Sequence, residues 1–126
     1  MKRLWIACAI LALLLAATLW NAGRLERFTA SLTDLLEQAE AQAEGEAWRE
    51  AYALTRLAYD RWESRSTSLH ITLRHSDTDD IQTGFQEVLE FLQCQEAGEY
   101  SAANARLIAR LELLSEAEQL SLENIL

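Results

Sequence analysis

Residues 4–20 read LWIACAILALLLAATLW, an apolar run that directly follows Lys2 and Arg3 and that only Thr18 interrupts. At about 1.5 Å per residue, an α-helix over this run rises roughly 26 Å. With residues 21–23 added, it just reaches across a bilayer core of about 30 Å. The sequence therefore predicts a transmembrane helix over residues 1–23, followed by one small domain over residues 24–126.

The apolar run lacks a good cleavage site. A secretory signal needs small residues at the last and third-last positions before the cut. Ala16 and Ala17 are small, but the frames that use them place Leu15 or Thr18 at the other decisive position. The run is also longer than the roughly 7 to 15 apolar residues of a cleaved signal. We expect an uncleaved signal anchor, and a cleaved signal peptide is the alternative.

The flanking charges predict the orientation of the anchor. Lys2, Arg3 and the amino terminus favour a cytoplasmic start by the positive-inside rule. Arg24 and Arg27 lie just past the span and weaken this bias. The domain over residues 24–126 is therefore expected outside the cytoplasm, in a single-pass protein of the cell membrane.

The domain is strongly acidic. All 20 acidic residues follow the apolar run, together with nine of the 11 basic residues, so the domain has about eleven net negative charges. This charge argues against nucleic acid as a partner, because phosphates need basic side chains. It also argues against a domain that lies flat on anionic lipid. The charges are expected to solubilise the helices, and a basic partner or weakly bound cations are the alternatives.

The two cysteines do not suggest a disulfide framework. Cys8 lies in the predicted span and Cys94 in the distal domain, so they cannot pair within one molecule. Cys94 has no partner cysteine at CxxC spacing and no neighbouring histidine. We expect it to be a small packing residue rather than a reactive thiol.

The chain after the anchor predicts an all-α antiparallel bundle of two helical hairpins. It contains no proline and is rich in Ala, Leu, Glu, Gln and Arg. The anchor helix is expected to continue to Glu44. Gly45 is expected to stop it, as glycine does at a helix C′ position, and Glu46 to begin the second helix with an acidic first turn. Its predicted core face consists of Leu25, Phe28, Leu32, Leu35, Ala39 and Gln42.

The second predicted helix has a long seam of residues at alternating intervals of four and three. The seam consists of Trp48, Tyr52, Thr55, Tyr59, Trp62, Ser66, Leu69, Leu73 and Ser76. Because the phase persists through residues 64–68, one long helix is favoured there over a loop. Leu69, Ile71 and Leu73 also alternate as in a strand, but a lone strand has no pairing partner.

Two further long helices and a short one complete the predicted bundle. The third begins after Ser76, runs to about Ala97 before Gly98, and has a core face of Ile81, Phe85, Val88 and Leu92. Gly84 within it predicts the close approach of another helix. The fourth has a core face of Tyr100, Ala103, Leu107, Leu111 and Leu114. Ser115 and Glu118 form a possible capping box for a last short helix to Leu126.

A weak internal repeat supports the two hairpins. Residues 35–37 precede Gly45 and Glu46, as residues 88–90 precede Gly98 and Glu99. An aromatic residue, Trp48 or Tyr100, follows each predicted turn. Each half resembles the helix pair of a tetratricopeptide repeat, but the offset of about 53 residues does not match the period of about 34 residues in that family.

One polar cluster, over residues 74–80, could bind a metal. His75, Asp77 and Asp79 are residue types that bind divalent cations. The same residues suit a helix start, with Ser76 as the N-cap and with Asp77, Asp79 and Asp80 in the first turn. We favour the capping role and assign no catalytic, cofactor-binding or metal-binding residue. His70 and His75 lie five residues apart, a poor helical chelate.

The four tryptophans fall into two pairs. Trp5 and Trp20 bracket the apolar run, where aromatic residues mark the membrane interface. Trp48 and Trp62 lie in the seam of the second helix and are expected in the core. A ligand groove along that seam is the alternative.

The order of these features resembles the bacterial domain-of-unknown-function family numbered 4363. The resemblance rests on the basic start with one apolar span, the hairpin with Trp48, then Trp62, residues 70–73, His75, residues 77–81 and the ending LSLENIL at 120–126. Members are small membrane-anchored helical proteins of Gram-positive anaerobes. The resemblance implies no assigned activity, cofactor or catalytic residue, and it supports an envelope protein with a single span.

Together these features predict a membrane-anchored interaction or accessory module of the bacterial envelope, and not an enzyme. The expected partner is a protein, either an integral membrane protein or a second copy of this chain. A small-ligand or cation-binding module is the alternative function. The apolar residues Leu120, Leu122, Ile125 and Leu126 do not share one helical face, so at least one is expected to contact a partner.

Overall fold

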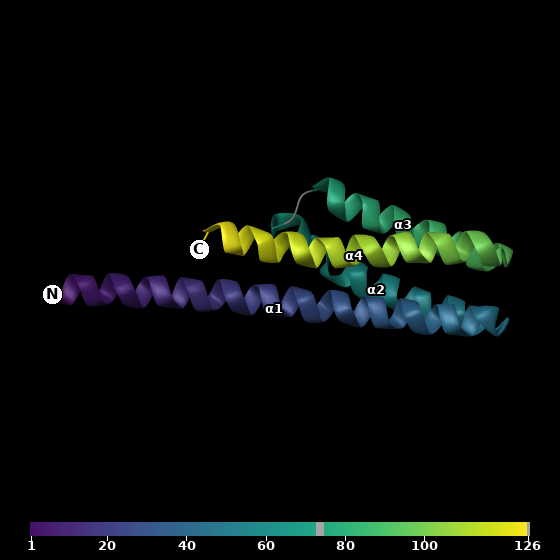
Figure 1. The fold of residues 1–126 in the computed structure, drawn as a ribbon, viewed down its shortest axis with the longest axis horizontal. Helices are drawn as coiled ribbons and strands as arrows, with labels where there is room; N and C mark the ends of the chain where they lie inside the picture. Colours follow the sequence, from purple (N-terminus) through teal and green to yellow (C-terminus); the bar gives the residue numbers. More distant parts are fainter. Residues whose placement is uncertain (73–74, 126) are drawn as a thin grey trace.

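The computed structural model is a bundle of four α-helices (Figure 1). It describes the backbone of residues 1–72 and 75–125, and their side chains apart from 21–22, 67–72, 75–77 and 118–125. The helices are α1 (Lys2–Glu44), α2 (Trp48–Thr72), α3 (His75–Cys94) and α4 (Ala97–Ile125). The predicted all-α class is confirmed. Both chain ends lie at the same end of the bundle.

The helices alternate in direction and form two hairpins side by side (Figure 1). α1 packs on α2 and α4, and α3 packs on the same two helices. In the described part of the chain, no Cα atoms of the diagonal pairs, α1 with α3 and α2 with α4, come within 8 Å of each other. This is the antiparallel four-helix arrangement that amphipathic helices joined by short turns adopt.

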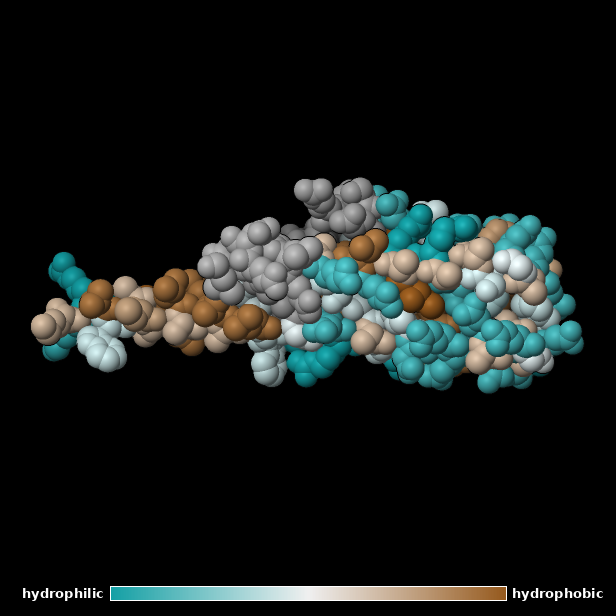
Figure 2. Space-filling view, viewed as in Figure 1, coloured by the Kyte–Doolittle hydropathy of each residue, from teal (hydrophilic) through white to brown (hydrophobic). Residues whose placement is uncertain are grey.

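Helix α1 combines an exposed apolar half with a packed half. Its N-terminal half contains an 18-residue window of mean hydropathy 2.1, none of it buried, and the helix is long and apolar enough to cross a membrane. Figure 2 shows this half as a brown rod that projects from the bundle. Burial begins at Leu25. The predicted continuation of the anchor helix to Glu44 is confirmed.

The core largely follows the predicted faces. The predicted core residues of α3 and α4 are all buried, and so are Thr55, Tyr59 and Trp62 of α2. On α1 the prediction was wrong at Gln42, which is exposed. Leu36 and Ala43 are buried instead, because α1 packs on both α2 and α4 and so buries a wider stripe than one seam.

The two hairpin turns have the same backbone geometry and differ from the predicted turns. α1 and α3, the helices before these turns, each end in a Schellman motif. Ala47 N–H donates to Gln42 O at 2.9 Å, and Glu96 N–H donates to Phe91 O at 3.1 Å. The left-handed residues are Glu46 (φ 62°) and Gln95 (φ 56°). α1 ends at Glu44 and Gly45 follows it, as predicted, but Gly45 has φ −86°, so its predicted role as the C′ glycine was wrong. Gly98 lies in the first turn of α4, not between helices.

The turns reveal the register of the internal repeat. Glu46 and Gln95 are 49 residues apart, so the predicted offset of 53 was wrong. At this offset buried residues of one hairpin match buried residues of the other. The pairs are Thr29 and Thr78, Leu32 and Ile81, Leu36 and Phe85, Ala39 and Val88, Ala43 and Leu92, Ala51 and Tyr100, Thr55 and Asn104, Ala58 and Leu107, and Trp62 and Leu111. Even the buried polar positions coincide.

Other boundaries also differ from the predictions. α2 remains one helix through residues 64–68 as predicted, and residues 69–72 continue it, so the strand alternative was wrong there. α3 begins at His75, which places Ser76 inside its first turn, and it ends at Cys94 rather than Ala97. α4 passes Ser115 without a break and runs as one helix from Ala97 to Ile125. The prediction of a separate short helix at the C-terminal end was therefore wrong.

α3 and α4 approach each other closely at Gly84. A Cβ atom at this position would lie 3.0 Å from Leu107 Cδ1 and 3.8 Å from Leu107 Cβ. Leu107 is fully buried, so it has little room to move. The predicted close approach of another helix is confirmed.

Candidate functional site

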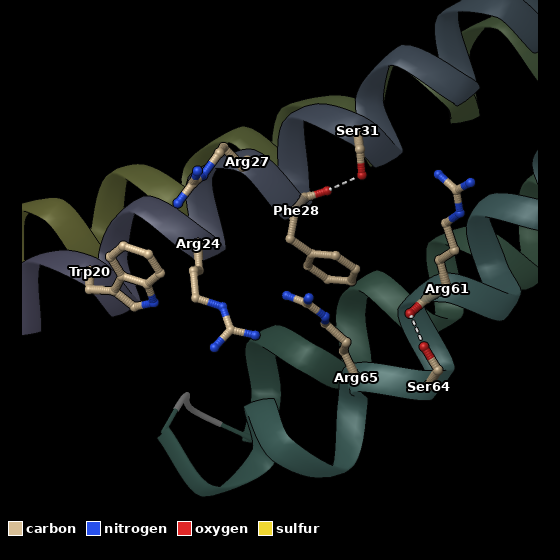
Figure 3. Close-up of a pocket in the computed structure, with 8 residues that line it drawn as sticks. All are labelled: Trp20, Arg24, Arg27, Phe28, Ser31, Arg61, Ser64 and Arg65. Carbon is tan, nitrogen blue, oxygen red and sulfur yellow. Dashed lines mark hydrogen bonds between the residues drawn. The ribbon is translucent and has the colours of Figure 1, made fainter. Parts of the chain in front are cut away.

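A basic groove lies between α1 and α2 at the end of the bundle nearest the apolar half of α1 (Figure 3). Its volume is about 560 Å³. We call it the arginine groove. It is lined by Trp20, Arg24, Arg27, Phe28, Ser31, Arg61, Ser64 and Arg65.

A stack of side chains forms the inner wall of the arginine groove. The Phe28 ring lies parallel to that of Trp62, with centroids 6.4 Å apart and an interplanar angle of 14°. The guanidinium carbon of Arg65 lies 4.7 Å from the centroid of the Phe28 ring. Trp62 is only 1% exposed, so the stack rests on the core. This cation–π contact holds Arg65 while its N–H edges remain open to a ligand.

The other arginines surround this stack. Figure 3 shows Arg24 of α1 and Arg65 of α2 pointing into the space between the two helices. Arg27 lies along α1, where its Nε donates to Gly23 O at 3.2 Å and its guanidinium is 6.0 Å from the Trp20 ring. Arg61 points away from Arg24 along α2. The site therefore has a central pair of guanidiniums and two flanking ones.

The serines of the groove are turned toward their own helices. Ser31 Oγ donates to Phe28 O, and Ser64 Oγ donates to Arg61 O, both at 2.8 Å. Each hydroxyl satisfies a backbone carbonyl of the preceding turn. The groove therefore offers an incoming ligand mainly guanidinium groups.

Charge is sharply divided around α1. None of the eight residues that line the arginine groove is acidic. A second groove, between α1 and α4, is lined by acidic and small polar residues. Its carboxylates are Glu26, Asp34, Glu37, Glu112 and Glu116. The net negative charge of the domain thus conceals a basic face of α1 beside the anchor.

The far end of the bundle is acidic. There Tyr100 is buried beside Glu40 and Glu44, and burial together with these two carboxylates raises the pKa of its hydroxyl. At the second turn, a hydrogen bond with Glu99 and repulsion from that carboxylate raise the pKa of Glu96. These shifts show that carboxylates crowd this end.

The structure describes only some of the side chains that the sequence suggested as sites. Trp62 is packed in the core, whereas Trp48 is half-buried and lines a small cavity of about 50 Å³ together with Glu44 and Tyr100. Asp79 and Asp80 are exposed, whereas the side chains of Ser76, Asp77 and both histidines lie outside the described ones. Among the described residues no three His, Cys, Asp or Glu side chains lie close enough to hold a metal ion.

Cys94 is exposed, so the prediction of a packing role was wrong. It is the last residue of α3, immediately before the turn, where Leu92 is the last core residue of the helix. Its side chain therefore lies beyond the packed face.

Sequence reasoning considered Arg24 and Arg27 as flanking charges and missed their partners Arg61 and Arg65. The two pairs are far apart in sequence, and only the hairpin brings them together. The signal that could have found them is the hairpin register. In an antiparallel pair the sum of facing residue numbers is nearly constant, so the stack of Phe28 on Trp62 places Arg65 near Arg24.

A family model described as "Domain of unknown function (DUF4363)" matches residues 19–125. The match begins at the end of the apolar run and covers the whole bundle. No curated protein and no solved structure matches the chain.

Proposed function

This chain belongs to the DUF4363 family, whose description assigns no activity, and we propose that it is a single-pass membrane-anchored interaction module. The bundle stands outside the cytoplasm in a bacterial envelope and acts through protein contacts, not catalysis. The observation that supports this proposal most strongly is the unbroken path of α1 from its exposed apolar half into the core.

The continuity of α1 favours a bundle fixed to the membrane surface. Burial starts at Leu25, only five residues after Trp20, so there is no linker between span and bundle. From Leu25 to Glu44, α1 is about 30 Å long at about 1.5 Å per residue. The two hairpin turns would therefore be held about 30 Å from the bilayer. This geometry suits a spacer or an accessory subunit of a larger membrane protein.

The proposed orientation places Lys2 inside and Leu126 outside. Only charges close to the span in sequence influence insertion. These are Lys2, Arg3 and the amino terminus on one side, and Arg24 and Arg27 on the other. Arg61 and Arg65 reach this level only after the hairpin folds, so they do not oppose the orientation.

Two features favour contacts at the surface over an enclosed ligand site. The core is filled by interlocking apolar side chains, and Asn104 Nδ2 links α4 to α1 by donating to Leu36 O at 3.1 Å. A buried polar contact of this kind fixes helix register. The acidic far end complements a basic partner surface. A second copy of this chain is the other candidate partner.

Protease protection tests the topology. The protein is expressed with a C-terminal tag. The cell wall is then removed, and the intact cells are treated with protease. We expect loss of the tag and retention of a short fragment with the N-terminus. A soluble mature form beginning near residue 21, or full protection of the tag, would contradict the proposal. Crosslinking of the full-length protein in its native membrane, followed by pull-down, then identifies the partner.

A further inference from the structure

We propose that the arginine groove binds the phosphate group of an anionic phospholipid and so clamps the bundle to the bilayer surface. This inference rests on the proposed membrane attachment, because it requires the groove to lie beside lipid. It deepens that proposal by identifying a chemical partner for one end of the bundle.

The first support is depth. Trp20 is 66% exposed and lies at the end of the apolar run, the level at which tryptophan prefers the membrane interface. Arg24 is one helical turn further, about 6 Å at about 1.5 Å per residue. The polar headgroup layer is about 5 to 8 Å thick on each side of the core. Arg24 therefore falls at the level of the phosphates.

The second support is that the facing helix α2 adds an arginine to the same groove. Arg65 comes from α2 and lies over Phe28, two turns beyond Trp20 on α1. Figure 3 shows its guanidinium against the Phe28 ring, in the same space between α1 and α2 that Arg24 enters. Two guanidiniums on opposite walls can each donate two parallel N–H bonds to a phosphate between them.

The third support is electrostatic. Guanidiniums that share one groove repel, and the described residues that line it include no carboxylate to compensate. Among the described residues, Arg56 pairs with Asp60 at 3.4 Å and Arg106 with Glu87 at 2.9 Å, whereas no ion pair involves an arginine of the groove. An anion from outside would relieve this repulsion. The acidic α1–α4 groove then orients the molecule, because anionic lipid repels that side.

Native mass spectrometry of the full-length protein in detergent micelles measures the binding. The probes are phosphatidylglycerol, zwitterionic phosphatidylcholine and inorganic phosphate. The test variant is R24Q/R65Q. The matched control is R49Q/R106Q, which removes the same charge from exposed positions outside the groove.

We expect wild type to retain phosphatidylglycerol in preference to phosphatidylcholine. R24Q/R65Q should bind phosphatidylglycerol roughly 25-fold more weakly, about fivefold for each arginine near the surface. The control should stay within about twofold of wild type. Circular dichroism should show equal helicity, because Arg24 and Arg65 are both exposed. Should the double variant unfold, R24Q and R65Q alone provide the test, each with a loss of about fivefold.

Three results would overturn the inference. One is an equal loss in R49Q/R106Q, which would show that only net charge matters. Another is the absence of a preference between the two lipids in wild type. The third is displacement of phosphatidylglycerol by an equal concentration of inorganic phosphate, which would identify a free anion as the ligand. Resistance of wild type to carbonate extraction tests the membrane attachment separately, so the two proposals can fail independently.

Discussion

Moving one glycine by one residue should stabilise the first hairpin. Glu46 is in the left-handed conformation at φ 62°, whereas the adjacent Gly45 is at φ −86°, which any residue can adopt. A Cβ at Gly45 would lie 3.6 and 3.9 Å from two backbone oxygens, ordinary contact distances. The double variant G45A/E46G therefore places glycine where the turn needs it and alanine where the turn tolerates it.

The expected gain follows from the backbone energies. A non-glycine residue in the left-handed region costs about 1 to 2 kcal/mol. An added glycine normally offsets part of such a gain, by about 0.4 to 1 kcal/mol, because it loosens the unfolded chain. The exchange keeps the number of glycines constant, so this offset cancels. We expect a gain of about 1 to 2 kcal/mol for G45A/E46G, and a smaller gain for Q95G, which adds a glycine.

Thermal melts of the full-length protein in micelles, followed by circular dichroism, measure the effect. The reference is E46Q, which removes the carboxylate from the end of α1 and leaves the backbone unchanged. A domain of this size gains about 4 to 8 °C in melting temperature for each kcal/mol. A melting temperature of G45A/E46G equal to or below that of E46Q would refute the assignment of the left-handed residue.

Three further predictions concern the bundle. G84A should destabilise wild type by about 1 to 3 kcal/mol through overpacking, but should stabilise an L107A background by roughly 1 kcal/mol, as a double-mutant cycle in denaturant would show. Glu99 raises the pKa of Glu96 above its unfolded value, so wild type should lose stability as pH rises from the unfolded pKa through the raised folded pKa. E96Q should therefore melt higher than wild type at pH 7 but not at pH 3. Deletion of residues 121–126 should release a co-purifying partner or dissociate an oligomer, with helicity by circular dichroism kept; loss of the fold would show that this segment belongs to the core.

The helices and their buried faces could be predicted from the sequence because helical periodicity is a property of each segment. Leu107 and Leu111, for example, recur at the spacing of one face and are both fully buried. Gln42 fits the same periodicity on α1, yet it is exposed. Periodicity gives the direction of a face, whereas the neighbours decide its width and its end.

Local signals misled at the helix ends. Gly45 and Gly98 suggested the turns, but the Schellman hydrogen bonds place the left-handed residues at Glu46 and Gln95. Ser115 and Glu118 match a capping box, yet α4 continues past them. Such patterns recur inside helices, and packing of the following turn decides whether the chain bends. The error in the repeat offset arose from the same glycines.

The arginine groove could not be predicted from composition. Net charge averages over the whole domain, whereas binding depends on charges within a few ångströms of each other. Arg24 and Arg65 come together through the register of the hairpin, which depends on the length of the turn. A turn one residue longer would shift that register and separate the two.

The central claim is that one unbroken helix leads from the bilayer into the bundle. Spin labels placed singly along residues 12–32 of the full-length protein in liposomes test it most directly, with Cys8 and Cys94 replaced by serine. Accessibility to oxygen and to a water-soluble relaxation agent is measured at each position. We predict that labels before Trp20 contact lipid alone, and that the 3.6-residue period continues without a shift from Arg24, with Leu25 and Phe28 protected from both reagents. Access of the water-soluble agent before Trp20, or a loss of the period between residues 20 and 25, would contradict the account.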